Sequence, residues 1–299
     1  MENRKKNYEP EIQIRVNPII ISNVFEALSF NLDNPDRIRA REIWENAEQG
    51  AGIVIAVLDS GIQTDHPDLV GNIIGGYNFT KDDHSNPEIY SDYLGHGTHV
   101  SGVIAAADNN KGVVGIAPKC KLLILKIINR QGEGSFKALT NAINYAIDWR
   151  GPKGEKVRII NMSVGGKDTN DELYRAIKYA HSKGIILVAA AGNEGDGDPI
   201  TTEVSYPGFY KEVIQVGSLS ETKIPSKFSN TNVNLDFVGP GENILSTHLN
   251  GDYVKLTGTS MAAPFVSGSA ALILKILVIL KCEWHLFTYM TICYYIRYP

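Results

Sequence analysis

Three short segments of this 299-residue chain carry an aspartate, a histidine and a serine that together could activate a nucleophile. Asp59 follows the apolar run 53–58, His96 lies between two glycines, and Ser260 opens the apolar stretch 260–275. A serine hydroxyl is a weak nucleophile until a base removes its proton, and an imidazole base needs a partner that holds its tautomer. The set therefore suits acyl transfer, with Ser260 attacking, His96 accepting the proton and Asp59 orienting His96.

Each of these residues also has a plainer explanation when it is considered alone. Asp59 could cap a turn, His96 could be buried against backbone groups, and Ser260 could be a helix N-cap. Alternatively, His66, His96 and His99 could hold the metal of a metallopeptidase, although such a site needs further ligands that the sequence does not fix. The combination of three such residues, each at the end of a buried element, favours the nucleophilic interpretation.

Short apolar runs without polar alternation recur from Gly52 onward, as expected for strands that are buried on both faces of a parallel sheet. These runs occupy residues 53–58, 121–128, 157–164, 185–191 and 213–219. Helical stretches follow at 97–107, 136–149, 172–183 and 260–275. The alternation predicts an α/β fold, a doubly wound, mostly parallel sheet with helices on both faces, whereas residues 1–50 look irregular. Active sites of such folds lie beyond the carboxyl ends of the strands.

Composition excludes several classes of protein. Hydrophobic residues make up 43% and charged residues 21%, which is ordinary for a globular protein, and the net charge of −4 provides no basic field for nucleic acid. Three cysteines are too few for a disulfide framework and fit a reducing compartment. The N-terminus lacks the apolar stretch of a secretory signal, and the apolar run 270–280 contains Lys275 and is too short to span a membrane. We therefore expect a cytoplasmic protein that binds neither nucleic acid nor membrane.

Five segments resemble the signature blocks of the subtilisin-like serine proteases, and they read AVLDSGI, HPDL, GHGTHVSG, AAAGNEG and GTSMAAP. The order Asp, His, Ser is also the order in subtilisin. The similarity runs from about residue 50 to about residue 275 and is greatest to the bacterial intracellular serine proteases. The resemblance implies a serine endopeptidase that works through an acyl-enzyme, with His96 rather than His99 as the base and Asn193 as an oxyanion-hole amide.

The resemblance also implies binding sites for substrate and for calcium. An extended protein or peptide substrate would pair with an edge strand at residues 163–166, and the small residues around its pocket imply broad specificity with an apolar preference. The implied substrate-binding residues are Ser163, Val164, Gly165, Ala190, Gly192 and Ser205. The implied Ca²⁺ ligands are the side chains of Asp68 and Asn109 with the carbonyl oxygens of Ala107, Lys111 and Val113.

Three regions follow from the extent of the similarity. Residues 1–45 would be an N-terminal extension that inhibits the enzyme, with Pro18 matching a proline of the relatives' extensions, and residues 46–275 would be the catalytic domain. Residues 276–299 form an atypical C-terminal tail, which raises the alternative of a catalytically impaired subtilase-like protein. The intracellular branch also implies a homodimer. We further expect Pro264 in the first turn of its helix, where a missing N–H needs no partner.

Overall fold

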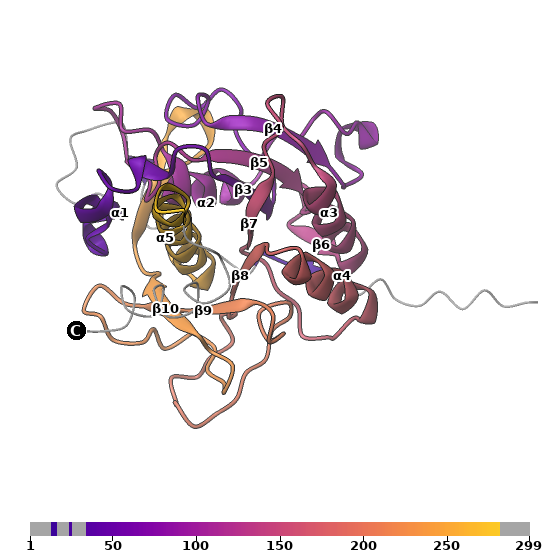
Figure 1. Cartoon of the computed structure of the whole chain (residues 1–299). Helices are drawn as coiled ribbons and strands as arrows, with labels where there is room; N and C mark the ends of the chain where they lie inside the picture. The colour runs from indigo at the N-terminus through magenta and orange to yellow at the C-terminus, as the bar shows by residue number, and fades with distance from the viewer. Residues whose placement is uncertain (1–12, 17–23, 26–33, 282–299) are drawn as a thin grey trace, which may run out of the picture.

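A seven-stranded parallel sheet forms the centre of the computed structural model, which describes residues 13–16, 24–25 and 34–281. The strands are hydrogen-bonded in the order β10-β9-β8-β7-β3-β5-β4, and they can be followed across the molecule in Figure 1. All six strand pairs in this sheet are parallel. The strands are β3 (Val54–Asp59), β4 (Ile73–Asn78), β5 (Lys121–Lys126), β7 (Val157–Met162), β8 (Ile186–Ala190), β9 (Ile214–Leu219) and β10 (Phe237–Pro240).

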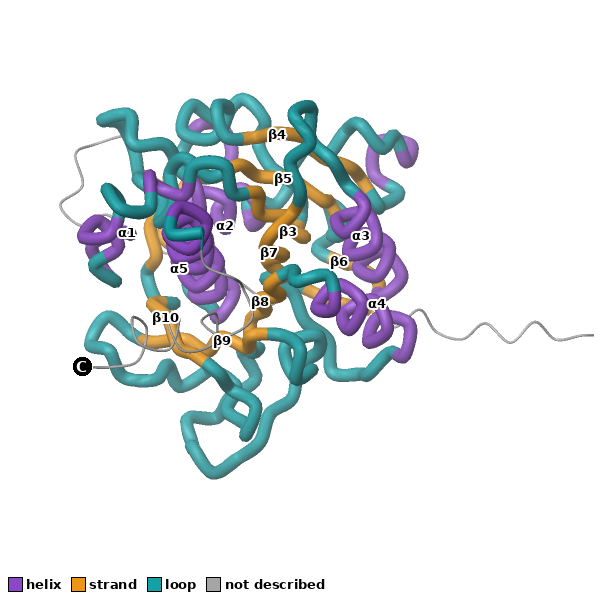
Figure 2. The backbone as a smooth tube through the Cα atoms, in the orientation of Figure 1, coloured by secondary structure: helices purple, strands orange, loops and turns teal. Residues whose placement is uncertain are grey.

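Helices cover both faces of this sheet. The helices α2 (His96–Ala105) and α5 (Thr259–Ile279) lie on one side, and α3 (Phe136–Asp148) and α4 (Asp171–Ser182) lie on the other (Figures 1 and 2). Alternate residues of β3 enter the two cores: Ile55 packs on the α2 and α5 side, and Val54 on the α3 and α4 side. The prediction of a doubly wound α/β fold is confirmed.

Local sequence explains where two of these helices begin. The side chain of Ser135 accepts a hydrogen bond from the Ala138 N–H at the start of α3, and Asn170 does the same for Leu173 at the start of α4. Such caps satisfy backbone donors that have no partner inside the helix. Both helices then bury only one face, because their apolar residues recur at helical spacing.

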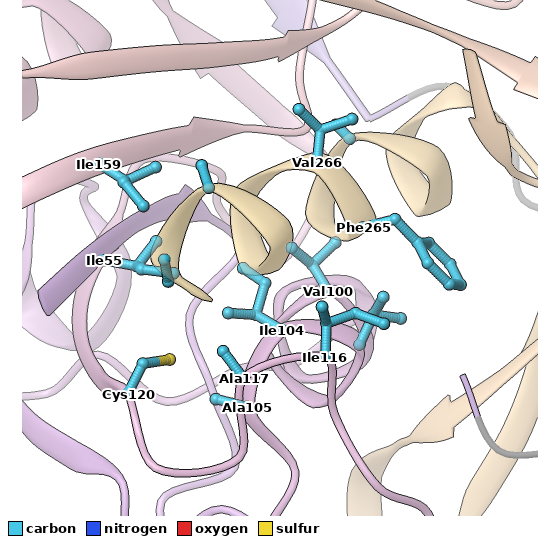
Figure 3. Packing of buried hydrophobic residues seen from close by; sticks show 14 of the residues in the cluster. Ile55, Val100, Ile104, Ala105, Ile116, Ala117, Cys120, Ile159, Phe265 and Val266 are labelled. Carbon is cyan, nitrogen blue, oxygen red and sulfur yellow. The ribbon is translucent and has the colours of Figure 1, made fainter. Parts of the chain in front are cut away.

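The helix α5 runs through the core and crosses α2, as Figure 3 shows. Its Phe265 side chain is 2% exposed and belongs to the same buried cluster as Val100 and Ile104. At 21 residues, α5 is longer than the predicted stretch and is apolar enough to cross a membrane, but 78% of its apolar window is buried inside the protein. This burial is typical of the core helix of a globular fold.

Several elements differ from the sequence prediction. The strands β4 and β10 were not predicted, because they lie at the two edges of the sheet and are only partly buried. Within residues 1–50, which looked irregular, the structure has β1 (Gln13–Arg15), β2 (Val24–Phe25) and α1 (Asn34–Arg37), followed by short 3₁₀ turns at 40–43 and 48–50. In the small antiparallel sheets, β1 pairs with β6 (Glu133–Ser135), and β12 (Tyr253–Leu256) pairs with β2 and β11 (Ile244–Thr247).

The direction in which strands are added reverses at β3, which has β5 on one side and β7 on the other. Asp59 is the last residue of β3, and Ser163 follows the last residue of β7. Parallel strands end at the same edge of a sheet, and the crevice at such a switch point is the usual ligand site of these folds. The fold therefore brings the end of β3 and the predicted substrate strand to one place.

Candidate active site

A short hydrogen bond joins the predicted aspartate and histidine. Asp59 ends β3 and His96 opens α2, and the distance from His96 Nδ1 to Asp59 Oδ1 is 2.6 Å, with both side chains 1% exposed. Because Nδ1 faces a carboxylate, it carries the proton, and Nε2 is then the acceptor of the neutral ring. In the described part of the chain, the buried Nε2 atom has no hydrogen-bond partner. The ring is therefore oriented to accept a proton at Nε2.

Asp92 joins the end of β3 to the start of α2. Its carboxylate is buried and accepts hydrogen bonds from Ser60 Oγ, from the Leu94 N–H and from both the N–H and the hydroxyl of Thr98. Ser60 Oγ in turn accepts from the Gly97 N–H at 2.9 Å. Burial alone would raise the pKa of Asp92, but these hydrogen bonds together lower it below its ordinary value. A buried anion thus fixes the helix that carries His96.

Backbone conformation and space explain why a glycine precedes His96. Gly95 has a φ of +82°, a left-handed conformation that other residues adopt at a cost. A Cβ atom at this position would also collide with the His248 ring. A larger residue at position 95 would therefore disturb the start of α2, where His96 lies.

His99 differs sharply from His96. It is fully buried, and its Nε2 lies 2.8 Å from the Ile244 carbonyl oxygen and 3.2 Å from that of Val254. Burial, more than any other cause, lowers the pKa of His99 to about 3, so the ring stays neutral and bound to backbone. Across the residues that the structure describes, no three or more His, Cys, Asp or Glu side chains gather as metal ligands. These observations favour His96 as the base over a metal site that uses His99.

Ser260 is the second residue of α5, and it is not hydrogen-bonded to His96 in the described structure. Its hydroxyl donates to the Ser163 carbonyl oxygen at 3.1 Å, and the Ser163 hydroxyl donates to the Ser260 carbonyl oxygen at 2.9 Å. Pro264 lies in the second turn of α5 and not in the first, contrary to the prediction. The helix tolerates it because the Ser260 carbonyl, which would accept the missing N–H of residue 264, accepts the Ser163 hydroxyl instead.

Asn193 is held by the residue before Ser260. Its Oδ1 accepts hydrogen bonds from the N–H and from the hydroxyl of Thr259, both at 2.9 Å. These two donors identify the oxygen end of the amide, so the Nδ2 end remains to donate elsewhere. Thr259 was not singled out in the sequence, since a threonine beside a serine is no signal by itself.

One pocket gathers the predicted substrate-binding residues. It is lined by Arg15, Ser163, Val164, Gly165, Ala190, Gly192, Asn193, Ser205, Thr259 and Ser260. Asp59 and His96 do not line this pocket. Arg15 was not predicted as a pocket residue, although it belongs to the extension that the resemblance places over the active site. It reaches the pocket because β1 pairs with β6 and the Arg15 N–H donates to the Gly165 carbonyl oxygen at 3.3 Å.

The structure also brings Asp68 to the loop 107–113. The buried Asp68 carboxylate accepts hydrogen bonds from Asn109 Nδ2 at 2.9 Å, from the Tyr253 hydroxyl at 2.7 Å and from the Val113 N–H at 3.3 Å. A carboxylate, an amide oxygen and backbone carbonyls are the ligand types that Ca²⁺ prefers. Asn109 now points its nitrogen at Asp68, so its amide would have to turn to present oxygen to an ion.

The sequence matches the model of the subtilase family over residues 50–281. It is 53% identical over 237 residues to the major intracellular serine protease of Bacillus subtilis strain 168. The aligned region covers 79% of this chain and 72% of that protein. It is 50% identical over 238 residues to the intracellular serine protease of Paenibacillus polymyxa, with coverages of 80% and 71%. Thermitase of Thermoactinomyces vulgaris is 39% identical over 240 residues, which is 80% of each chain.

We predict that His99 makes the stability of the protein depend on pH. Its pKa is 6.5 in the unfolded chain and about 3 in the folded one, so only the unfolded chain binds this proton between those values. The free energy of unfolding should therefore fall as the pH drops below 6.5, by up to about 1.4 kcal/mol per pH unit from this residue. Urea denaturation measures the free energy of unfolding at each pH. Between pH 7 and pH 5 this free energy should fall less steeply for His99→Gln than for the parent. The exposed His181→Gln serves as the control, and equal slopes for parent and His99→Gln would contradict the prediction.

Proposed function

The chain belongs to the subtilase family and is a serine endopeptidase, and on this basis we propose that Ser260, His96 and Asp59 are its catalytic triad. The observation that carries the proposal is the buried Asp59–His96 hydrogen bond, which leaves the imidazole Nε2 without a partner in the described residues. Ser260 adds the nucleophile, because it lines the pocket that holds the predicted substrate-binding residues.

The mechanism begins when Ser260 turns its hydroxyl from the Ser163 carbonyl to His96 Nε2. The oxygen attacks the peptide carbonyl carbon while His96 takes the proton, and Asp59 stabilises the imidazolium that forms. His96 then gives the proton to the leaving amine, and an acyl-enzyme on Ser260 remains. Water hydrolyses this ester with His96 again as the base.

Asn193 and the start of α5 stabilise the oxyanion. Thr259 holds the Asn193 oxygen, so Nδ2 is the end that donates to the developing charge. The Ser260 N–H is the second donor, and the positive end of the α5 dipole favours an anion at the same place. The bonds from Thr259 to the Asn193 oxygen support this role, because they restrain the amide before charge develops.

Substrate would lie extended along Ser163, Val164 and Gly165, with its side chain before the cut enclosed by Ala190, Gly192 and Ser205. The pairing of Arg15 with Gly165 supports this geometry, because it shows that an extended strand fits there. The small walls support broad specificity with an apolar preference. Neither the metallopeptidase nor the catalytically impaired alternative gains support from the family match.

The N-terminal extension, which we place at residues 1–45 ahead of a catalytic domain at 46–275, acts as an inhibitor in this proposal. Its residue Ile14 is fully buried, and β1 lies between β6 and the segment that starts at Ser163. The strand β1 would therefore occupy the place of an extended substrate. Pro18 and the tail beyond residue 281 lie outside the described residues.

A structural Ca²⁺ is the further part of the proposal. Asp68 and Asn109 would supply side-chain oxygens, and Ala107, Lys111 and Val113 would supply carbonyls. The ion would tie the loop 107–113 to Asp68 and would take no part in the chemistry. A cytoplasmic location agrees with the intracellular names of two relatives. The homodimer and the absence of nucleic-acid and membrane binding stay predictions.

We predict that a fluorophosphonate probe adds one label to the protein, at Ser260. Ser260→Ala should take up no label, because the proposed triad activates Ser260. Asn193→Ala should be labelled but should lose about 10²–10³ in kcat, a size known for subtilisin itself. Intact mass and peptide mapping provide the readout, and Ser182→Ala, on the surface of α4, is the matched control. Label at another residue, or label retained by Ser260→Ala, would refute the triad.

We predict that Ile14→Asp raises kcat/KM for an apolar chromogenic peptide. Burial of an isoleucine contributes about 1.5–3 kcal/mol, so its loss should release the extension and raise activity roughly 10- to 100-fold. Ile200→Asp makes the same change at a side chain that is 88% exposed and should have no effect. Deletion of residues 1–22 should also activate the enzyme. Unchanged or lower activity after this deletion would rule out an inhibitory extension.

We predict that calcium raises the midpoint of thermal unfolding. At a concentration of 100 times Kd, an ion bound only by the folded state contributes about 2.7 kcal/mol. Asp68→Asn should abolish the response to calcium and to a chelator, whereas Asp236→Asn, on the loop before β10, should keep it. A parent protein whose unfolding midpoint is the same with calcium and with chelator would show that the site does not bind the ion.

A further inference from the structure

A chain of buried polar side chains connects the middle of α5 back to its first turn through β7. Ser267 Oγ donates to Asn161 Oδ1 at 2.7 Å, and Asn161 Nδ2 donates to Ser163 Oγ at 3.0 Å. Ser163 Oγ then donates to the Ser260 carbonyl oxygen at 2.9 Å. The side chains of Ser267, Asn161 and Ser163 are all fully buried. Water therefore does not compete for these hydrogen bonds, and each group depends on its neighbour.

The hydrogen bonds of this chain can run in only one direction. The Ser163 hydroxyl has a single proton, and the Ser260 carbonyl can only accept, so Ser163 must in turn accept from the Asn161 amide nitrogen. The Asn161 oxygen is then directed at Ser267, whose hydroxyl donates to it. If Asn161 turned its amide over, its oxygen would compete for the Ser163 proton. The Ser267 hydroxyl thus adds a second restraint on the orientation of Asn161, at the opposite end of the amide from Ser163.

Pro264 makes the last hydrogen bond necessary. In a regular helix the Ser260 carbonyl would accept from the N–H of residue 264, which a proline lacks. The Ser163 hydroxyl is the replacement donor, and Ser260 Oγ donates back to the Ser163 carbonyl at 3.1 Å. An unsatisfied buried carbonyl would be costly. The Ser163 side chain, which is hydrogen-bonded to Asn161, therefore holds the peptide of Ser260.

We propose that Asn161 and Ser267 are positioning residues for Ser260 and act on it through Ser163. The proposal rests on the proposed function, in which Ser260 is the nucleophile. Ser267 is seven residues further along α5, roughly 10 Å along the helix axis, so it touches none of the reacting atoms. Without the Ser267 hydroxyl, the Asn161 amide is held at only one end, and the donor to the Ser260 carbonyl is held less firmly. Small displacements of a nucleophile slow its attack.

The test measures the rate at which the fluorophosphonate probe modifies Ser260, together with kcat and KM for an apolar peptide. Ser267→Ala should slow modification and lower kcat about tenfold, the effect of roughly one hydrogen bond, with KM changed less than about twofold. Asn161→Asp should cause a larger loss, since it presents an acceptor in place of the donor to Ser163. Ser267→Ala removes only a hydroxyl and so remains informative if Asn161→Asp does not fold.

Ser269→Ala is the matched control on the same helix. Ser269 is also buried and its hydroxyl donates to the Phe265 carbonyl at 2.8 Å, a bond within α5 that has no link to β7. The Ser269→Ala variant should react with the probe at the parent rate, even if the substitution lowers the unfolding midpoint as much as Ser267→Ala does. Ser267→Ala reacting no more slowly than Ser269→Ala, or losing activity only through KM, would overturn the positioning role. A parent protein that takes up no label at Ser260 would instead overturn the nucleophile itself.

Discussion

The hydrogen bond between Asp59 and His96 is the interaction on which the rest of the site depends. It joins the end of a strand to the start of a helix, and both side chains are almost completely buried. Removing the His96 ring would leave the buried Asp59 carboxylate without this donor, and a buried charge that lacks a hydrogen-bond partner is costly. The Asp92 carboxylate and Ser60 supply the second connection between the same two elements. The position of the imidazole therefore follows from the packing of β3 against α2.

The nucleophile is held by a separate set of contacts, on the other helix of the same face. Pro264 removes one backbone donor from α5, and the end of β7 replaces it with the Ser163 hydroxyl. Thr259, the residue before Ser260, orients Asn193. The ends of β3 and β7 and the starts of α2 and α5 thus deliver polar groups to the switch point of the sheet. In the described state the Ser260 hydroxyl donates to the Ser163 carbonyl oxygen, and the proposed mechanism requires this hydroxyl to turn to His96 Nε2.

Much of this arrangement could be predicted from the sequence, for identifiable reasons. The strands β3, β5, β7, β8 and β9 are buried on both faces and therefore appear as continuous apolar runs, which also places Asp59 at the sheet edge. The edge strands β4 and β10 lack such runs. The pairing of β1 with β6 could not be predicted, because a three-residue strand has no periodicity and its partner lies more than 100 residues away. Arg15 in the pocket and the Ser267–Asn161 bond depend on the same kind of long-range contact.

The central claim is that Asp59 fixes the proton of His96 on Nδ1 and so leaves Nε2 as the acceptor. Nitrogen-15 NMR of the histidine rings tests it most directly, because it distinguishes a protonated Nδ1 from a protonated Nε2. The account predicts that the neutral His96 ring is protonated at Nδ1, with a strongly deshielded, slowly exchanging proton that the short bond to Asp59 explains. A neutral His96 ring that carries its proton on Nε2 would contradict the account.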